Sequence, residues 1–280
     1  MNGFNSDLLD GKTKLHFVGI GGSGMFPLVQ ILHAVGYEIT GSDVGEGDIV
    51  EREKAMGIPV YHGHRAENVH GAQLVVYTAA ILKGNPEVEE AQRLGIPTVE
   101  RSVLLGYVAN TYPCPICISG THGKTTTTAM TVQIMVMAGL DPAAVIGGKL
   151  PLIDGYGRYG AGRNIVVEAC EYHNTFLQLV PHTSVVLNID ADHLEFFKTM
   201  DNLKAAFRKF ARTHCGSPAP KGAHARPARR ARPRQTRRRT GGTPARSRRG
   251  NRPAGARRRC ARRGRCRPRR PACWRRRCWR

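Results

Sequence analysis

Hydrophobic residues in the first part of the chain gather in short runs that alternate with amphipathic stretches. The runs predict strands over residues 14–19, 37–41, 58–61, 73–78 and 96–100. The stretches between them predict helices that follow residue 25 and cover 48–56, 86–94 and 102–110. Strands that are apolar throughout and alternate with helices are typical of a doubly wound parallel sheet. The pattern predicts an α/β domain over residues 12–111.

The alternation continues less completely to residue 213. It predicts a helix from residue 124 to a glycine cap at Gly139, a glycine turn over 145–149 and a partly amphipathic helix over 203–211. Strands are predicted over residues 116–118, 164–167 and 184–187. We therefore expect a second, incomplete α/β domain over residues 112–213.

A glycine-rich turn follows the first predicted strand. It reads G-x-G-x-x-G, in which glycines allow a tight turn and close approach of the backbone to a phosphate. Its residues are Gly19, Ile20, Gly21, Gly22, Ser23, Gly24 and Met25. Asp43 follows the second predicted strand, where a carboxylate meets a ribose hydroxyl in dinucleotide folds. This context predicts a Rossmann-like nucleotide-binding domain, and a plain glycine-rich turn is the alternative.

A second glycine loop opens the helix at residue 124. Backbone N–H groups of such a loop bind a polyphosphate, the lysine reaches the terminal phosphates, and the following hydroxyl ligates Mg²⁺. The loop consists of Gly120, Thr121, His122, Gly123, Lys124, Thr125 and Thr126. The general pattern G-x-x-x-x-G-K-[ST] would place a glycine where Ile118 stands, so this loop is shorter. We predict phosphate binding, against a chance Gly-Lys-Thr at a helix start.

Acidic residues and a histidine follow two predicted strands of the second domain. Glu168 ends one strand, where a Mg²⁺–nucleotide site needs an acid to hold the metal while it bridges phosphates, although an acid at a solvated strand end is the alternative. Glu171 is a second candidate acid. Asp190, Asp192 and His193 cluster after the next strand, and His193 is either a metal ligand or a loop histidine at this stage.

Charge divides the chain sharply near residue 213. The net charge is +22, but residues 216–280 contain 25 Arg and one Lys with no Asp or Glu, which leaves residues 1–215 at −4. The tail has almost no apolar residues to offset the entropy of ordering, so we expect residues 214–280 to be disordered. The abrupt change favours a shifted reading frame over a selected nucleic-acid-binding tail, with only nonspecific binding of polyanions expected.

Cysteine spacing and hydropathy exclude several classes of protein. Cys215, Cys260, Cys266, Cys273 and Cys278 lack the paired spacing of a zinc site. The Cys114–Cys117 pair precedes an apolar run, which favours a buried strand cysteine over a redox pair. No signal peptide and no apolar run of membrane-spanning length is present, so we expect a cytoplasmic protein without membrane contact.

Taken together, the motifs resemble the Mur ligases of peptidoglycan synthesis. The resemblance covers about residues 12–213. It rests on residues 17–25, 41–43, 120–127, 167–171 and 188–193, in that order. The short G-T-H-G-K-T loop is the form that this family uses, so its departure from the general pattern supports the resemblance.

The resemblance implies an ATP-dependent ligase of cell-wall synthesis that joins L-alanine to UDP-N-acetylmuramic acid. In the family the γ-phosphate moves to the lactyl carboxylate of the sugar, and the amine attacks the acyl phosphate. By resemblance, the turn at residues 19–25 with Asp43 would bind the UDP-sugar, and residues 120–126 would bind ATP, with His122 facing the cleft between the two substrates. Lys124, Glu168 and His193 would be catalytic, and Thr125, Glu168 and His193 would hold Mg²⁺.

Mur ligases also carry a third domain that helps to bind the amino acid, and nothing in this sequence matches it. We therefore expect that the chain as written does not complete the ligase reaction. An NAD-dependent oxidoreductase, based on G-x-G-x-x-G and Asp43, is one alternative, but it leaves the second glycine loop unexplained. A nucleic-acid-binding protein led by its basic tail is the other alternative.

Overall fold

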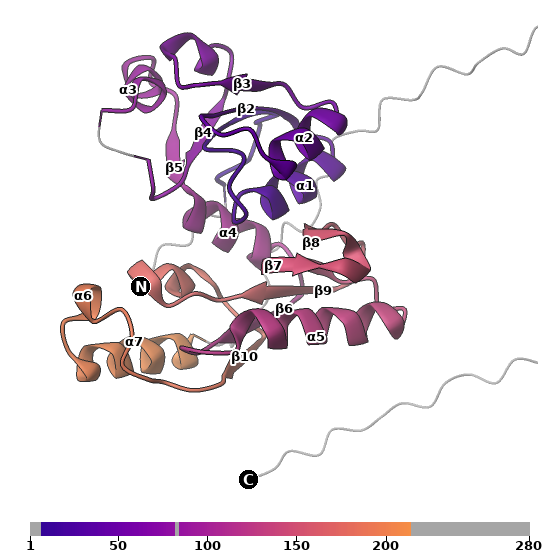
Figure 1. Cartoon of the computed structure of the whole chain (residues 1–280), viewed down its shortest axis with the longest axis vertical. Helices are drawn as coiled ribbons and strands as arrows, with labels where there is room; N and C mark the ends of the chain where they lie inside the picture. The colour runs from indigo at the N-terminus through magenta and orange to yellow at the C-terminus, as the bar shows by residue number, and fades with distance from the viewer. Residues whose placement is uncertain (1–6, 82–83, 214–280) are drawn as a thin grey trace, which may run out of the picture. The chain divides into compact units, whose positions relative to one another are not determined.

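A computed structural model of the chain describes residues 7–81 and 84–213. Within them the chain forms two five-stranded sheets, the first built from residues 14–100 and the second from residues 114–186 (Figure 1). The predicted α/β class is confirmed. The expectations for residues 214–280, disorder and a shifted frame, lie outside the described residues. The domain bounds at residues 111 and 213 stay a prediction.

The first sheet is entirely parallel, with strand order β3-β2-β1-β4-β5. Its strands are β1 (Lys14–Val18), β2 (Glu38–Asp43), β3 (Val60–His62), β4 (Leu74–Tyr77) and β5 (Thr98–Glu100). The helices between and after them are α1 (Phe26–Ala34), α2 (Asp48–Ala55), the 3-10 helix η1 (Ala66–Val69), α3 (Pro86–Arg93) and α4 (Arg101–Asn110). The doubly wound parallel sheet expected from the sequence is therefore present.

Local sequence signals explain where these helices start and stop. Before α3, the Asn85 side chain accepts the N–H groups of Glu87 at 3.0 Å and Val88 at 3.3 Å, and Pro86 takes the first helical position. α1, α2 and α3 are each followed by a glycine with positive φ, which ends the helix in a left-handed cap. These glycines are Gly36, Gly57 and Gly95.

The first sheet is buried on both faces because successive side chains of a strand point to opposite sides. Leu15 and Phe17 of β1 belong to the core that includes residues of α1 and α4. Val18 packs on the other face with Ala91 of α3. His16 lies on that second face too and is fully buried beside Glu87.

The second sheet is mixed, with strand order β10-β6-β9-β7-β8 and one antiparallel pair, β7 with β8. Its strands are β6 (Cys114–Ser119), β7 (Ala143–Leu150), β8 (Gly155–Arg158), β9 (Asn164–Glu168) and β10 (Thr183–Val186). The accompanying helices are α5 (Lys124–Met137), η2 (Pro151–Ile153), η3 (Tyr172–Gln178), α6 (Leu194–Phe197) and α7 (Met200–Arg212).

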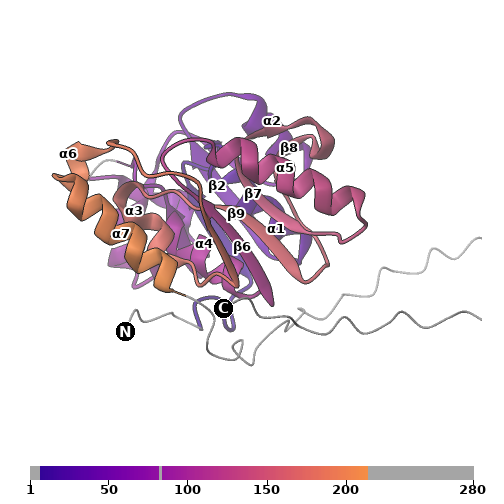
Figure 2. The ribbon, with the colours of Figure 1, turned by 90° about the horizontal axis from the view of Figure 1, so that it is seen from below.

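The two longest of these helices, α5 and α7, are seen in Figure 2. α5 lies along β6, β7 and β9 and packs through Val132 and Met135. α7 lies beside β10, and its Thr199 hydroxyl cap accepts the N–H of Asn202 at 3.2 Å. The Phe210 ring of α7 stacks on Phe176 with centroids 4.8 Å apart. α7 is longer than the predicted helix because its cap lies four residues before the first buried apolar position, Leu203.

The prediction of a glycine turn at residues 145–149 is wrong. These residues lie inside strand β7, which pairs with β9 on one side and with β8 on the other. The pairing register with β8 shifts between Val145 and Leu150. Gly147 and Gly148 occupy this irregular stretch, where glycine allows the close approach of other groups described below.

The cysteine interpretation is confirmed for the strand. Cys117 of β6 is buried, and burial raises the pKa of its thiol to about 12. Cys114, Cys117 and Cys170 carry free thiols in the structure. Among residues 7–81 and 84–213, no helix combines the length and the apolar composition that a membrane span requires.

Candidate functional site

The first glycine turn is held in place by the end of β2. The N–H groups of Gly19 and Ile20 both donate to the Ser42 carbonyl, at 2.8 and 3.0 Å. The Asp43 carboxylate accepts the N–H of Gly21 on one oxygen and that of Gly45 on the other, each at 2.8 Å. Asp43 therefore fixes the conformation of the turn, and its predicted contact with a ribose stays a prediction.

Close packing explains the glycines of this turn. Gly19 has φ +79°, a conformation that other residues rarely adopt. A Cβ on Gly21 would lie 2.7 Å from Val50, and a Cβ on Gly24 would lie 3.2 Å from the Arg101 guanidinium. Of the other predicted residues, Met25 is buried in the core, and Gly22 and Ser23 complete the turn before α1.

Arg101 is a candidate that the sequence reasoning missed. It is the first residue of α4 and follows β5 directly, so it lies at the carboxyl end of the parallel strands, where such sheets bind ligands. Its guanidinium lies beside Gly24, and this group matches the geometry of phosphate oxygens. A lone arginine after a short strand gave no signal without the neighbouring turn.

The second glycine loop connects β6 to α5, as predicted. Gly120 and Gly123 have φ values of +138° and +80°. A Cβ on Gly120 would lie 3.0 Å from Leu187 and 3.1 Å from the Asn188 nitrogen, so the residues that follow β10 leave room only for glycine. The turn can therefore present its backbone N–H groups and the start of α5 to an anion.

Lys124 is folded back over this loop. Its ammonium donates to the carbonyls of Gly120 at 2.7 Å and Thr121 at 3.1 Å, and to Glu171 Oε1 at 3.1 Å. The lysine side chain is only 13% exposed, and that of Glu171 is 1% exposed. A charged pair in this position is a buried ion pair rather than a surface contact.

Thr125 and Glu168 contact each other directly. The Thr125 hydroxyl donates to Glu168 Oε1 at 2.9 Å, and the Gly147 N–H donates to Glu168 Oε2 at 2.6 Å. A Cβ on Gly147 would lie 2.6 Å from that oxygen, and a Cβ on Gly148 would lie 2.9 Å from the Thr125 methyl group. The two glycines of β7 are thus required where the acid meets the start of α5.

His193 also lies near Glu171. Its Nε2 is 3.9 Å from Glu171 Oε1, and its ring is 4.6 Å from the ring of Tyr172 between centroids. The structure brings His193 toward Glu171, whereas Glu168 contacts Thr125 and Gly147. Among the described residues, no group of three or more His, Cys, Asp or Glu side chains is arranged to hold a metal ion. The predicted Mg²⁺ set of Thr125, Glu168 and His193 stays a prediction.

The donor set nevertheless fits a metal–polyphosphate in chemical terms. Hard oxygen ligands from a hydroxyl and carboxylates suit Mg²⁺, and a loop with left-handed glycines suits phosphates. Glu171 Oε2 is buried and accepts no hydrogen bond in the structure, although it lies 3.1 Å from the Lys124 ammonium, so this carboxylate oxygen has capacity left for a further donor or cation.

The remaining loop residues are tied to the segment after β10. The N–H of His122 donates to the Asn188 side chain at 2.8 Å, and that side chain donates back to the His122 carbonyl at 3.0 Å. The Asp190 N–H donates to the Thr121 hydroxyl at 2.9 Å. The His122 ring is exposed, 3.6 Å from Asp190, and Thr126 is exposed on the first turn of α5.

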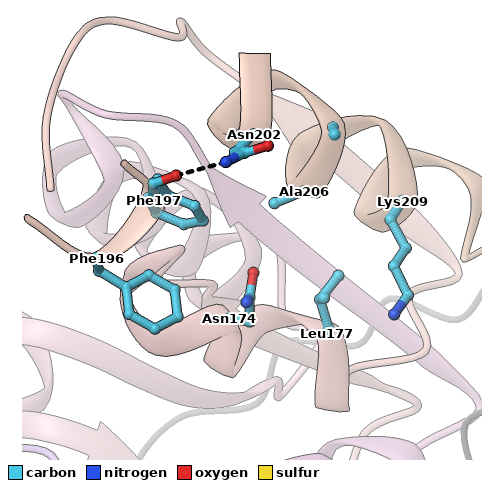
Figure 3. A pocket seen from close by; sticks show the side chains of 8 residues that line it. Asn174, Leu177, Phe196, Phe197, Asn202, Ala206 and Lys209 are labelled. Atoms are coloured by element: carbon cyan, nitrogen blue, oxygen red, sulfur yellow. Dashed lines mark hydrogen bonds between the residues drawn. The ribbon is translucent and has the colours of Figure 1, made fainter. Parts of the chain in front are cut away.

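A separate hollow of about 380 Å³ lies between η3, α6 and α7 (Figure 3). None of the predicted site residues lines it. Its walls are Asn174, Leu177, Phe196, Phe197, Asn202, Ala205, Ala206 and Lys209. Asn202 is engaged, because its side-chain amide donates to the Phe197 carbonyl at 2.9 Å. Asn174 has φ +59°, and its Oδ1 is buried without a partner.

Two protein-family models match the chain in succession. The Mur ligase family, catalytic domain model matches residues 14–113, and the Mur ligase middle domain model matches residues 118–217. The chain belongs to the Mur ligase family. The resemblance that the sequence motifs predicted is confirmed: the first match covers the whole first sheet, and the second begins within β6 and covers the rest of the second sheet.

Curated relatives in the Mur ligase family share nearly half of their aligned residues with the chain. The chain is 48% identical over 198 residues to UDP-N-acetylmuramate--L-alanine ligase of Acetivibrio thermocellus. The alignment covers 71% of this chain and 42% of the relative. The chain is 45% identical over 203 residues to the protein of that name from Caldanaerobacter subterraneus subsp. tengcongensis, covering 72% and 44%. The chain thus spans less than half the length of these relatives.

Solved Mur ligase structures share the fold. The UDP-N-acetylmuramate-alanine ligase MurC from Thermotoga maritima matches with a TM-score of 0.68 at 29% identity, covering 72% of this chain and 47% of that one. A UDP-N-acetylmuramate:L-alanyl-gamma-D-glutamyl-meso-diaminopimelate ligase from Neisseria meningitides matches with a TM-score of 0.68 at 27% identity, covering 74% and 70%.

Proposed function

We propose that this chain provides the nucleotide-binding part of an ATP-dependent ligase that joins L-alanine to UDP-N-acetylmuramic acid in peptidoglycan synthesis. Identity of 48% to a relative with that activity in its name supports the substrate pair. The observation that carries the proposal is the contact of Thr125 with Glu168, the last residue of β9, and of Lys124 with Glu171, three residues further on. The predicted cytoplasmic location belongs to the same proposal.

In this proposal residues 120–126 bind ATP. ATP supplies the phosphoryl group, and Mg²⁺ offsets its charge. The loop N–H groups and Lys124 hold the phosphates, and Thr125, Glu168 and His193 hold the metal. Bound in this way, the phosphates lie in a site whose charges are fixed before the reaction, which is the main protein contribution in phosphoryl transfer.

The turn at residues 19–25 is proposed to bind the diphosphate of the UDP-sugar. Backbone N–H groups at the start of α1 and the Arg101 guanidinium beside Gly24 supply the complementary charge. Asp43 keeps the turn in shape through Gly21 and Gly45. Both matched family models belong to the Mur ligases, so the NAD-dependent alternative gains no support.

Calorimetric titration of the whole chain tests the proposal. We expect binding of ATP with MgCl₂ and of UDP-N-acetylmuramate, and no comparable binding of NADH. Lys124→Ala should weaken ATP binding by about tenfold or more, since a charge-assisted phosphate contact is lost. Lys14→Ala removes the same charge from an exposed position and should bind ATP like the wild type. Absence of ATP binding by the wild-type chain would overturn the proposal.

The ligase reaction itself is expected to fail in this chain. It spans less than half the length of its named relatives. Incubation with UDP-N-acetylmuramate, L-alanine and ATP should release no phosphate above the background of a Lys124→Ala sample. Turnover would show that residues 1–280 suffice for catalysis.

A further inference from the structure

The ammonium of Lys124 has no free donor in this structure. An ammonium carries three N–H groups, and three acceptors surround this one. They are the carbonyls of Gly120 and Thr121 and the Oε1 atom of Glu171. A phosphate can therefore bind Lys124 only by replacing one of these three acceptors.

Glu171 is the acceptor whose replacement has the largest electrostatic consequence. Its side chain is almost completely buried, and Oε2 lies 3.1 Å from Lys124 Nζ without a hydrogen bond of its own. A buried carboxylate is tolerated because a cation offsets the loss of water. When Lys124 turns toward a phosphate, Glu171 loses most of that compensation. The His193 ring, 3.9 Å away, is the remaining neighbour with a basic nitrogen among the contacts of Glu171.

A metal-free polyphosphate adds to the negative charge that is left uncompensated around Glu171. It brings several negative charges to a lysine whose former partner is a buried carboxylate, and like charges repel more strongly there than in water. A polyphosphate that carries a divalent cation brings positive charge to the same place. The cation offsets both the phosphates and the carboxylate that Lys124 has left.

We propose that Glu171 is a selectivity-determining residue that makes the loop reject polyphosphate without a metal. It acts as the internal counter-anion of Lys124 in the resting chain. The inference rests on the proposed phosphate site and adds a discrimination that the glycine loop alone does not provide. The loop N–H groups and Lys124 would attract metal-free and metal-bound polyphosphate alike.

The test compares two titrations of the full chain by calorimetry, ATP in EDTA and ATP with excess MgCl₂. Glu171→Gln keeps the size of the side chain and an acceptor oxygen but removes the charge. We expect it to bind metal-free ATP about fivefold or more tightly than the wild type does, with the Mg²⁺–ATP affinity changed less than about twofold. Glu38→Gln removes an equal charge from the exposed start of β2 and should leave both affinities unchanged.

The outcomes separate the two proposals. If the wild type binds both forms and Glu171→Gln binds metal-free ATP no more tightly, or tightens both forms equally, the selectivity inference is overturned. If the wild type binds neither form, the phosphate site itself is refuted. Thermal melting first checks that the variant folds. Should the buried amide prevent folding, Glu171→Met fills the same volume without charge and carries the same expectation.

Discussion

Two buried glutamates beside the first sheet show how surroundings decide the charge of one side-chain type. Burial opposes ionisation of Glu87, but the His16 ring 3.5 Å away and hydrogen bonds from Ser42 and Asn68 outweigh it and lower the pKa to about 2. Both carboxyl oxygens of Glu53 are buried without a hydrogen-bond partner in the structure. Burial, with the charge of Asp43, raises the pKa of Glu53 to about 8. At neutral pH the first is ionised and the second is mostly protonated.

Glu53→Gln should therefore become more favourable as pH rises. The folded chain keeps the Glu53 proton up to about pH 8, whereas the unfolded chain loses it near the ordinary pKa of 4.5. Ionisation destabilises the wild type across this window, so the variant should gain about 3 kcal/mol relative to it between pH 5 and pH 8. Urea unfolding at several pH values measures the difference. Glu51→Gln, exposed on the same helix, should show no such trend; a pH-independent difference for Glu53→Gln would contradict the account.

Gly147→Ala should damage the contact between Glu168 and Thr125. The added methyl group would overlap the Glu168 carboxylate, which must move away from both partners. We expect a loss of about 1–3 kcal/mol in the free energy of unfolding and weaker binding of Mg²⁺–ATP. Thermal melting and calorimetry measure the two effects. Gly47→Ser adds a Cβ that meets nothing within 4 Å, at the N-cap of α2 where serine is favoured, and should not lower stability by more than a few tenths of a kcal/mol; equal losses in both variants would argue against the steric account.

At the scale of elements, the longer helices and most strands were predictable because periodicity and caps are local signals, whereas the short helices η1, η2, η3 and α6 were not predicted. Strand β7 could not be predicted, because two successive glycines, Gly147 and Gly148, are typical of a turn. Only the fold shows that Glu168 and Thr125 pack against them, which explains why glycines stand in a strand. The strand β8 that pairs with it has too few apolar residues to stand out. Local sequence indicates which residues favour a helix or a strand. It does not show why glycine is needed at a position where residues distant in sequence pack against the backbone.

The candidate site divides in the same way. The glycine loops, Lys124 and Thr125 are neighbours in sequence, so a motif shows them together. The pairing of Lys124 with Glu171 joins the start of α5 to the N-cap of η3, and Glu171 was only a second candidate acid in the sequence. Arg101 became a candidate for phosphate binding only because the fold places its guanidinium beside Gly24. Roles that depend on partners distant in sequence need the fold.

Helix α5 has one buried face and one exposed apolar face. Val132 is fully buried against the sheet, whereas Met130, Ile134 and Met137 are 58%, 65% and 76% exposed. Val132→Ala should cost about 1–3 kcal/mol of unfolding free energy because it leaves a cavity. Ile134→Gln should change it by less than about 0.5 kcal/mol. Denaturant unfolding compares the two, and a large loss from Ile134→Gln would mean that the outer face is covered in solution.

On the scale of the whole molecule, charge and fold occupy different parts of the chain. Both sheets and both candidate loops lie within the described residues, up to residue 213. The excess of positive charge lies in residues 216–280, whereas residues 1–215 carry −4. Sequence-independent binding to polyanions and specific binding to nucleotides should therefore be separable.

Removal of residues 216–280 should separate these properties. The full chain should bind heparin and elute at a salt concentration that rises with its charge, whereas residues 1–215 should not be retained. Both forms should bind Mg²⁺–ATP with affinities that agree within about twofold, because the loop contacts described above are all made by residues before 214. A loss of ATP binding on truncation would show that the basic segment contributes to the nucleotide site.

The glycine pair of β7 has a consequence for the entropy of binding. Gly147 lets the strand backbone reach Glu168, and the carboxylate is held at both oxygens before any ligand arrives. Restricting a flexible side chain costs about 0.5–1.5 kcal/mol, and here folding bears that cost. A ligand that used Glu168 in this orientation would find one rotamer already selected. The same two hydrogen bonds restrict the Glu168 side chain to one orientation. A cation that needs another orientation would bind only if Glu168 gave up its hydrogen bond with Gly147 of β7.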